Sequence, residues 1–549
     1  MRALAAALVL LRAAAAGGAE APACGTTPDG SGSLLALHAY WAGTGALAAS
    51  SAAGPRDADV DHVAILEDHG DLVARRNPFD LDGSGLRFVP NPAGGYDPVP
   101  LAVPLEPAGP QVLAVPDNGA VAVDLPFAFP FFGQRHARAF VHGDGGVTFG
   151  APDAAGGERG MARFLGGPPR AAAFFTALDP SRGGTVTVRV AADRAVFLWS
   201  GVPGGGQLNR NTFQLALLAG GEVEVVFGEM QSREAIVGVA PGGSLALSPA
   251  DLARGTPRGT AGALVERFSE TDRLDLVSTV RRFLSTHGDL FQQVVVYTAR
   301  PLNPVPGSLA FEVNVRNDVR GIGLEVQDRG PEWGSDARLE SVVYMDTVDP
   351  YLEHDGFEIL GHEVGHRWLS RIRFRDPGGA GNGLLGRGLV HWSFFFDSDA
   401  SVMEGNDIAD RGAGRFETVD FARGYSALDQ YAMGLRAPAE VPPFFFVEGA
   451  DDFRPNRGFR FSSAPEAGVS FTGARREVRI EDVIAELGPR MPDDTRAPRS
   501  MRQAYVLVAD GAAAATDARR RAVARIRARF EDEYRRATGG RGTVDTTLP

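Results

Sequence analysis

The stretch that decides how this chain is interpreted spans residues 361–368 and reads Gly361-His362-Glu363-Val364-Gly365-His366-Arg367-Trp368. Histidines four positions apart lie one above the other on one face of an α-helix, so both can bind the same metal ion. The glutamate after the first histidine lies beside that face, where its carboxylate can hydrogen-bond a water without being a ligand. His362, Glu363 and His366 therefore predict the centre of a zinc hydrolase.

The flanking residues predict that this stretch is helical. Asp355 and Glu358 have the three-residue spacing of a capping box at the start of a helix. Apolar residues then follow at helical intervals, namely Phe357, Ile359, Leu360, Val364 and Trp368. We therefore expect a helix that begins near Asp355 and carries both histidines on one face.

A catalytic zinc site needs a third protein ligand in addition to water. Leu369 and Ile372 stand where metzincins have glycine and histidine, so that class is excluded. The downstream candidates are His391, Asp397, Asp399, Glu404 and Asp429. We prefer Asp429, on a short helix predicted over residues 425–435, and keep His391 as the second candidate. A structural role for Asp429 remains open, because Ser426 would form a capping box with it.

The expected chemistry is that of zinc-activated hydrolysis. Zinc lowers the pKa of a bound water toward about 7, and Glu363 would accept the proton and pass it to the leaving amine. The oxyanion needs a further donor, and the available residue types are His391, Tyr425 and Tyr431. The predicted metal ligands are His362, His366 and Asp429, and the predicted catalytic residues are Glu363, His391 and Tyr431.

The region before the zinc motif has a different pattern. Residues 106–250 alternate with period two and turn at glycines, which predicts an antiparallel β-sandwich. The clearest predicted strands are residues 185–190, 195–202, 213–218 and 222–227. Residues 24–105 are rich in Gly, Pro, Ala and Asp and are expected to form a small N-terminal segment or pro-region.

Helices and strands alternate from residue 265 onward. Helices are predicted at residues 272–285 and 517–536, and strands at residues 292–298, 309–315, 339–345 and 504–508. Asn406 to Gly414 is acidic and glycine-rich, and we interpret it as a solvated turn while keeping a structural Ca²⁺ open.

The amino terminus is typical of an exported protein. Met1-Arg2 is followed by an apolar run from Ala3 to Leu11 and then by small residues, so residues 1–23 are predicted to be a signal peptide. Cys24 is the single cysteine, which excludes an intramolecular disulfide and leaves a lipid anchor at Cys24 as an alternative. No later stretch is long and apolar enough to span a bilayer.

Two parts of the chain resemble known families. Residues 361–368, 391–395, 401–406 and 426–435 resemble a group of bacterial secreted zincin-like metallopeptidases. This resemblance implies an α+β catalytic domain over residues 265–549, with Asp429 as a ligand and Ser341 to Met345 as the edge strand beside an extended substrate. Residues 125–133, 173–179 and 211–215 resemble a nidogen-type extracellular β-domain, which implies adhesion, spacing or substrate docking.

These observations predict a multidomain fold, with an antiparallel β-sandwich accessory domain followed by an α+β zincin-like metallopeptidase domain. The predicted function is that of a secreted or cell-envelope zinc endopeptidase acting on proteins or peptides. A net charge of -13 argues against nucleic acid as a partner. Two alternatives remain, namely a surface adhesin or matrix-binding protein whose zinc site is structural or degenerate, and a zinc hydrolase acting on other bonds.

Overall fold

The computed structural model describes residues 24–25, 57–153, 159–244, 247–254, 258–302, 309–452 and 458–549. It is a multi-sheet, strand-rich protein with 39% strand and 17% helix, which confirms the expectation of a β-rich multidomain chain. The described residues divide into two compact units, one containing His69–Arg282 and the other containing residues 24–25, 57–68 and 283–549. The predicted signal peptide, residues 1–23, and the side chain of Cys24 lie outside the described residues.

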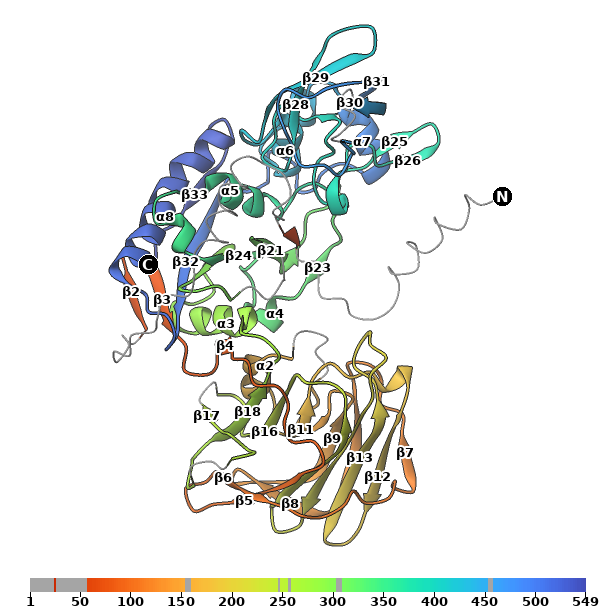
Figure 1. Ribbon diagram of the computed structural model, residues 1–549, viewed down its shortest axis with the longest axis vertical. Helices are drawn as coiled ribbons and strands as arrows, with labels where there is room; N and C mark the ends of the chain where they lie inside the picture. Colours follow the sequence, from red (N-terminus) through yellow and green to blue (C-terminus); the bar gives the residue numbers. More distant parts are fainter. Residues whose placement is uncertain are drawn as a thin grey trace. The chain divides into compact units, whose positions relative to one another are not determined.

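The first unit consists of two seven-stranded sheets (Figure 1). One sheet has the order β17 (Leu247–Pro249), β18 (Ala263–Phe268), β16 (Ala235–Ala240), β11 (Arg170–Phe175), β10 (Gly146–Phe149), β9 (Gln134–His142) and β8 (Ala120–Phe131). The other has the order β6 (Tyr96–Pro100), β5 (Gly85–Pro90), β15 (Val223–Met230), β14 (Asn211–Leu218), β13 (Arg194–Val202), β12 (Thr185–Val190) and β7 (Gln111–Leu113). All neighbours pair antiparallel except β17 and β18, and one hydrophobic core contains residues of both sheets.

The four clearest strands predicted from period-two alternation are present as β12, β13, β14 and β15. The expected boundaries of the sandwich are corrected. β5 and β6 lie before residue 106 yet extend the same sheet as β15, and β18 lies after residue 250. Residues 24–105 therefore do not form a separate segment, because their strands are divided between the two units.

The second unit is built on an eight-stranded mixed sheet. Its order is β1 (Cys24–Gly25), β21 (Phe311–Asn314), β24 (Ser341–Thr347), β20 (Gln293–Thr298), β32 (Ser500–Ala509), β3 (Val63–Glu67) and β2 (Ala58–Val60), with β33 (Thr543–Asp545) paired to β32. Parallel pairing joins β24, β20, β32 and β3. The predicted edge strand β24 is therefore internal, and β21 lies outside it in antiparallel register.

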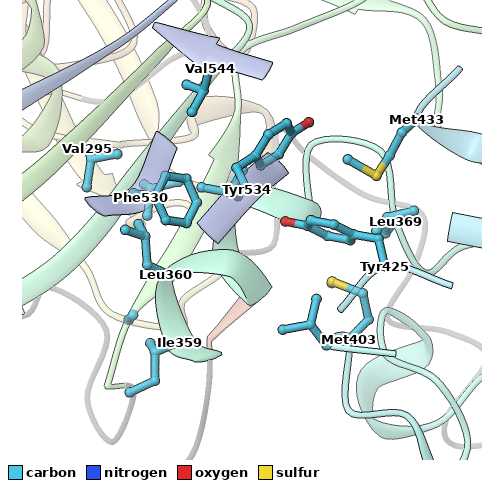
Figure 2. Packing of buried hydrophobic residues seen from close by; sticks show 14 of the residues in the cluster. Val295, Ile359, Leu360, Leu369, Met403, Tyr425, Met433, Phe530, Tyr534 and Val544 are labelled. Carbon is cyan, nitrogen blue, oxygen red and sulfur yellow. The ribbon is translucent and has the colours of Figure 1, made fainter. Parts of the chain in front are cut away.

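Two helices, α5 (Phe357–Gly365) and α8 (Asp517–Ala537), pack on one face of this sheet. Val295 and Val343 of the sheet belong to the same buried cluster as Leu360 of α5 and Phe530 of α8. Figure 2 shows Phe530 of α8 next to Leu360 of α5, with Val295 of the sheet beside them. The arginine-rich C-terminal helix is thus a packing helix, as its apolar spacing predicts.

A closed five-stranded barrel completes the second unit. Its strands are β27 (Phe396–Asp397), β28 (Asn406–Asp410), β29 (Arg415–Phe421), β31 (Ser470–Val478) and β30 (Phe444–Asp452). Phenylalanines dominate its interior, among them Phe394, Phe416 and Phe471. The block Asn406 to Gly414 is therefore a strand followed by a hairpin turn, in which Gly412 donates to the Asp410 carboxylate.

Among the described residues, the other α-helices are α2 (Met161–Gly166), α3 (Leu276–His287), α4 (Gly330–Trp333), α6 (Ala427–Ala432) and α7 (Ile480–Leu487). Three two-stranded pairs join β4 (Val73–Ala74) to β19 (Arg273–Leu274), β22 (Arg316–Asn317) to β23 (Gln327–Asp328), and β25 (Phe374–Asp376) to β26 (Gly379–Gly381). In the part of the chain that the structure describes, no helix has the length and apolar character needed to cross a membrane.

Candidate metal centre

The helix that carries the HExxH motif is short and almost completely buried. It begins at Phe357, and its cap residue Gly356 has φ 64°, a left-handed conformation that favours glycine. The expected capping box between Asp355 and Glu358 does not form, since no side chain caps this helix. Asp355 instead forms ion pairs with Arg525 and Arg529 of α8. The start predicted near Asp355 is therefore two residues too early.

Three histidines converge in the second unit. One nitrogen of each of His362, His366 and His391 lies within 4.8 Å of those of the other two, and all three residues are buried. The two Nε2 atoms of His362 and His366 are 3.0 Å apart. His362 and His366 lie close together because their four-residue spacing places them on one face at the C-terminal end of α5. The third comes from the loop that follows a 3-10 turn, Arg387–Leu389.

Hydrogen bonds to backbone carbonyls orient two of these rings. Nδ1 of His362 donates to the Val402 oxygen at 2.9 Å, and Nδ1 of His391 donates to the Arg387 oxygen at 2.8 Å. A carbonyl oxygen only accepts, so each Nδ1 carries the ring proton and each Nε2 presents a lone pair. Metal-binding histidines commonly donate their other ring N–H to an acceptor such as a backbone carbonyl in this way.

Burial also keeps the imidazoles in the form that binds metal. It lowers the pKa of His362, and it lowers the pKa of His366 well below the usual value, with further lowering from His362 and His391. Burial likewise lowers the pKa of His391 to about 3. All three rings are therefore neutral at pH 7, as metal ligation requires.

The donor set fits zinc. Three neutral imidazole nitrogens with Zn–N bonds of about 2.0–2.1 Å would leave one tetrahedral position for water or substrate. Among the described residues, no other group of three His, Cys, Asp or Glu side chains is close enough to hold an ion. The acidic block at Asn406 to Gly414 belongs to no such group.

Glu363, the predicted proton acceptor, is buried on the same helix as His362. It lies between the two helix histidines in sequence, and its side chain is completely buried. Its charge acts on Tyr351, whose pKa is raised first by burial and then by Asp346 and Glu363. A buried carboxylate next to a metal ligand, on the same helix, is what general-base chemistry at a bound water requires.

Asp429, the preferred third ligand, has a different position. Its Oδ1 accepts from Trp392 Nε1 at 2.9 Å, and its Oδ2 accepts from the Ser401 hydroxyl at 2.6 Å and the Ser426 backbone at 2.8 Å. The capping box with Ser426 is present. Asp429 is absent from the group of converging ligand atoms. The Asp429 carboxylate already accepts hydrogen bonds from three donors. We therefore replace Asp429 with His391 in the predicted set of metal ligands.

These hydrogen bonds give Asp429 an indirect connection to the histidines. Trp392 directly follows His391, and Ser401 directly precedes Val402, whose carbonyl orients His362. Asp429 therefore hydrogen-bonds to both the segment that carries His391 and the segment whose carbonyl orients His362. Burial raises its pKa to about 6, and the hydrogen bonds from Ser401 and Ser426 partly offset this rise.

The two candidate tyrosines have structural partners. The Tyr431 hydroxyl accepts from the Arg490 backbone at 3.1 Å, and the Tyr425 hydroxyl donates to the Gly361 carbonyl at 2.6 Å. Both rings belong to the hydrophobic core, and Figure 2 shows Tyr425 beside Met403 and Leu369. We therefore remove Tyr431 from the expected catalytic residues. His391 changes from oxyanion donor to ligand.

Sequence reasoning missed one charged residue at the centre. The Arg387 guanidinium donates to Nε2 of His391 at 3.0 Å and pairs with Glu404, including an Nε–Oε2 bond of 3.2 Å. Burial raises the pKa of Glu404, but His391 and Arg387 outweigh it, so the net shift is downward. No local pattern marks Arg387, because an isolated arginine on a loop is usually a surface residue. Asp397, by contrast, lies in the barrel, where it accepts from Ile408.

The strand next to α5 carries a buried acid with its own pH dependence. Glu312 on β21 is 3% exposed, and burial raises its pKa to about 7 although Arg371 and Arg367 oppose the shift. The unfolded carboxyl titrates near 4.5, so the folded state retains a proton between about pH 4.5 and pH 7. The free energy of unfolding contributed by Glu312 therefore falls as pH rises through this range.

We expect Glu312→Gln to remove this part of the pH dependence. Between pH 5 and pH 8, the metal-free wild type should lose on the order of 2 kcal/mol more than the variant does. Urea unfolding of both chains at the two pH values measures the difference, and Glu325→Gln, an exposed carboxylate of the same unit, is the control. Equal losses in wild type and Glu312→Gln would show that Glu312 ionises normally.

No family model matches this chain, and neither a curated protein nor a solved structure matches it. Its function must therefore be argued from the chemistry of the histidine centre. The features that support a function are three neutral imidazoles, two of them oriented by backbone carbonyls, a buried glutamate on the same helix as His362, and an arginine that contacts His391.

Proposed function

We propose that the chain is an exported zinc-dependent endopeptidase. The convergence of His362, His366 and His391 on one point, with Glu363 buried on the same helix, is the observation that carries this proposal. Export is argued from the signal-like residues 1–23, and a lipid anchor at Cys24 remains compatible with it.

The residues present would divide the chemistry between them. Zinc, when bound, supplies a Lewis acid that polarises a carbonyl and makes water acidic near neutral pH. Glu363 would accept the proton from the attacking water and deliver it to the leaving nitrogen of the cleaved amide. Burial of the three histidines lowers the local dielectric constant, which strengthens the charge interactions at the centre.

The fold supports a zincin-like interpretation of the second unit. Helix α5 crosses a mixed sheet whose outer part ends in the antiparallel pair β24 and β21. On the outer side of β21, the structure describes only the short strand β1, which pairs through Cys24 and Gly25. Since β1 covers Phe311 and Glu312, an extended peptide would add by backbone hydrogen bonding along the rest of this edge. We therefore propose β21, instead of β24, as the strand beside which the substrate would lie.

The main alternative is an adhesin or matrix-binding protein with a structural zinc. The β-sandwich favours it, since a nidogen-like domain would serve attachment. Structural zinc sites, however, usually have four protein ligands, whereas three converge in the part of the chain that is described. A hydrolase of another bond type would use the same centre, so substrate tests must include peptides and esters.

The test is metal-dependent proteolysis by the purified chain. We expect about one zinc per chain, cleavage of an unfolded protein such as reduced casein, loss of cleavage with a zinc chelator, and recovery when zinc is restored. A chain that binds zinc but cleaves no peptide or ester would favour the adhesin. A chain that binds no zinc would contradict the proposed function.

A further inference from the structure

Arg387 contacts Nε2 of His391, the ring nitrogen that would bind a metal. Its guanidinium nitrogen donates to Nε2 of His391 at 3.0 Å, and Nδ1 of the same ring is already bonded to the Arg387 carbonyl. Nε2 is therefore the metal-facing atom, and the arginine donor points directly at it. A bound metal takes this lone pair, so the N–H of Arg387 must then find a different acceptor.

Glu404 prevents the guanidinium from leaving the centre. The Arg387–Glu404 contact is two-pronged, through Nε and a terminal nitrogen, a geometry that fixes orientation. Oε1 of Glu404 is also 3.9 Å from Nε2 of His391. The side chain of Glu404 is 11% exposed, so this ion pair is largely shielded from solvent. The cation therefore stays beside the triad when the metal displaces its hydrogen bond.

We propose that Arg387 and the metal together form an anion-binding position, in which Arg387 holds a negatively charged oxygen of the substrate or product. The inference rests on the proposed function, because it assumes that the triad binds metal. The side chain of Arg387 is 24% exposed while the three histidines are at most 3% exposed, so the guanidinium is the part of this group that solvent reaches. Guanidinium groups match carboxylates and oxyanions well.

During peptide hydrolysis this position would serve two successive anions. As water adds to the carbonyl carbon, the carbonyl oxygen becomes an oxyanion, and an N–H donor placed there lowers the barrier. When the C–N bond breaks, the amine leaves with the proton delivered by Glu363, and the acyl half is released as a carboxylic acid. Its remaining hydroxyl proton then passes to Glu363 and on to solvent, which leaves a carboxylate. Arg387 would contact the oxygen in both cases, so it belongs to the binding machinery and is more than a support for its loop.

Acetate binding to the cobalt-loaded chain tests this inference without requiring turnover. Cobalt replaces zinc, and the visible absorption of the ion reports its ligands. We expect acetate to change the wild-type spectrum, Arg387→Ala to bind acetate at least about tenfold more weakly, and Arg387→Lys to lie between them. Arg423→Ala, which removes an arginine 73% exposed in the same unit, is the matched control and should behave like wild type.

The outcomes separate this inference from the proposed function. If Arg387→Ala takes up cobalt and binds acetate as tightly as wild type does, the anion position is wrong while the metal site stands. If Arg387→Ala loses cobalt, and Arg387→Lys binds cobalt but has wild-type acetate affinity, the role of Arg387 is structural. A wild-type chain that takes up no cobalt or zinc overturns the proposed function and this inference together.

Discussion

Glu363→Gln is expected to reduce peptide cleavage by at least about 10³-fold while the zinc content stays at that of the wild type. Glutamine has nearly the same size as glutamate, so it fits the completely buried position without a cavity. It cannot accept a proton from water, however, and it has none to deliver to a leaving amine. Turnover with a peptide of known cleavage and metal analysis of the same preparation measure the two quantities.

The matched control is Glu358→Gln, a carboxylate exposed on the same helix, which should leave both zinc content and turnover unchanged. Retention of more than about a tenth of the wild-type turnover in Glu363→Gln would remove Glu363 as the general base. Loss of zinc in this variant would instead make Glu363 a ligand. Wild-type behaviour in every property is the result expected of an adhesin.

The elements of the fold could largely be predicted because they depend on local periodicity. The strand at Thr185–Val190 and the helix at Asp517–Ala537 coincide closely with their predicted ranges. Sheet membership depends on long-range pairing, which periodicity does not encode. In the sequence, β3 is only a short apolar run near the N-terminus. It nevertheless pairs in parallel with β32, more than 400 residues later, where Ala64 is the partner of Val506. The error of a separate N-terminal segment has this cause.

In the candidate centre, too, local spacing predicts some residues, whereas long-range contacts determine the others. The spacing of His362 and His366 is a property of one helix, so the sequence predicts their convergence. His391 reaches the same point from a loop whose path is set by the bonds of Trp392 and Ser401 to Asp429. Asp429 is prominent in the sequence because it begins a helix, and that capping role is the one the structure assigns to it. Arg387 has no local signal at all.

Replacing the third ligand should separate the two assignments. We expect His391→Ala to weaken zinc binding by more than about 100-fold, beyond the roughly 10–100-fold typical of outer-shell changes. Asp429→Asn keeps the three imidazoles but replaces one carboxylate oxygen with an NH2 group, which then faces either the donor of Trp392 or the donors of Ser401 and Ser426. It should therefore retain zinc with at most an outer-shell loss of affinity, while losing about 1–3 kcal/mol of stability. Competitive zinc titration and urea unfolding measure these effects.

X-ray absorption of the zinc-loaded wild type provides a check that does not depend on how the variants fold. Three imidazoles should contribute to the zinc scattering, and His391→Ala should reduce that number to two in whatever fraction retains metal. Two imidazoles and a carboxylate in the wild type would restore Asp429 as the third ligand, and Asp429→Asn would then lose zinc as completely as His391→Ala is expected to. Because Asp429 links Trp392 to Ser401, an intermediate loss in Asp429→Asn, with three imidazoles still counted, supports its positioning role.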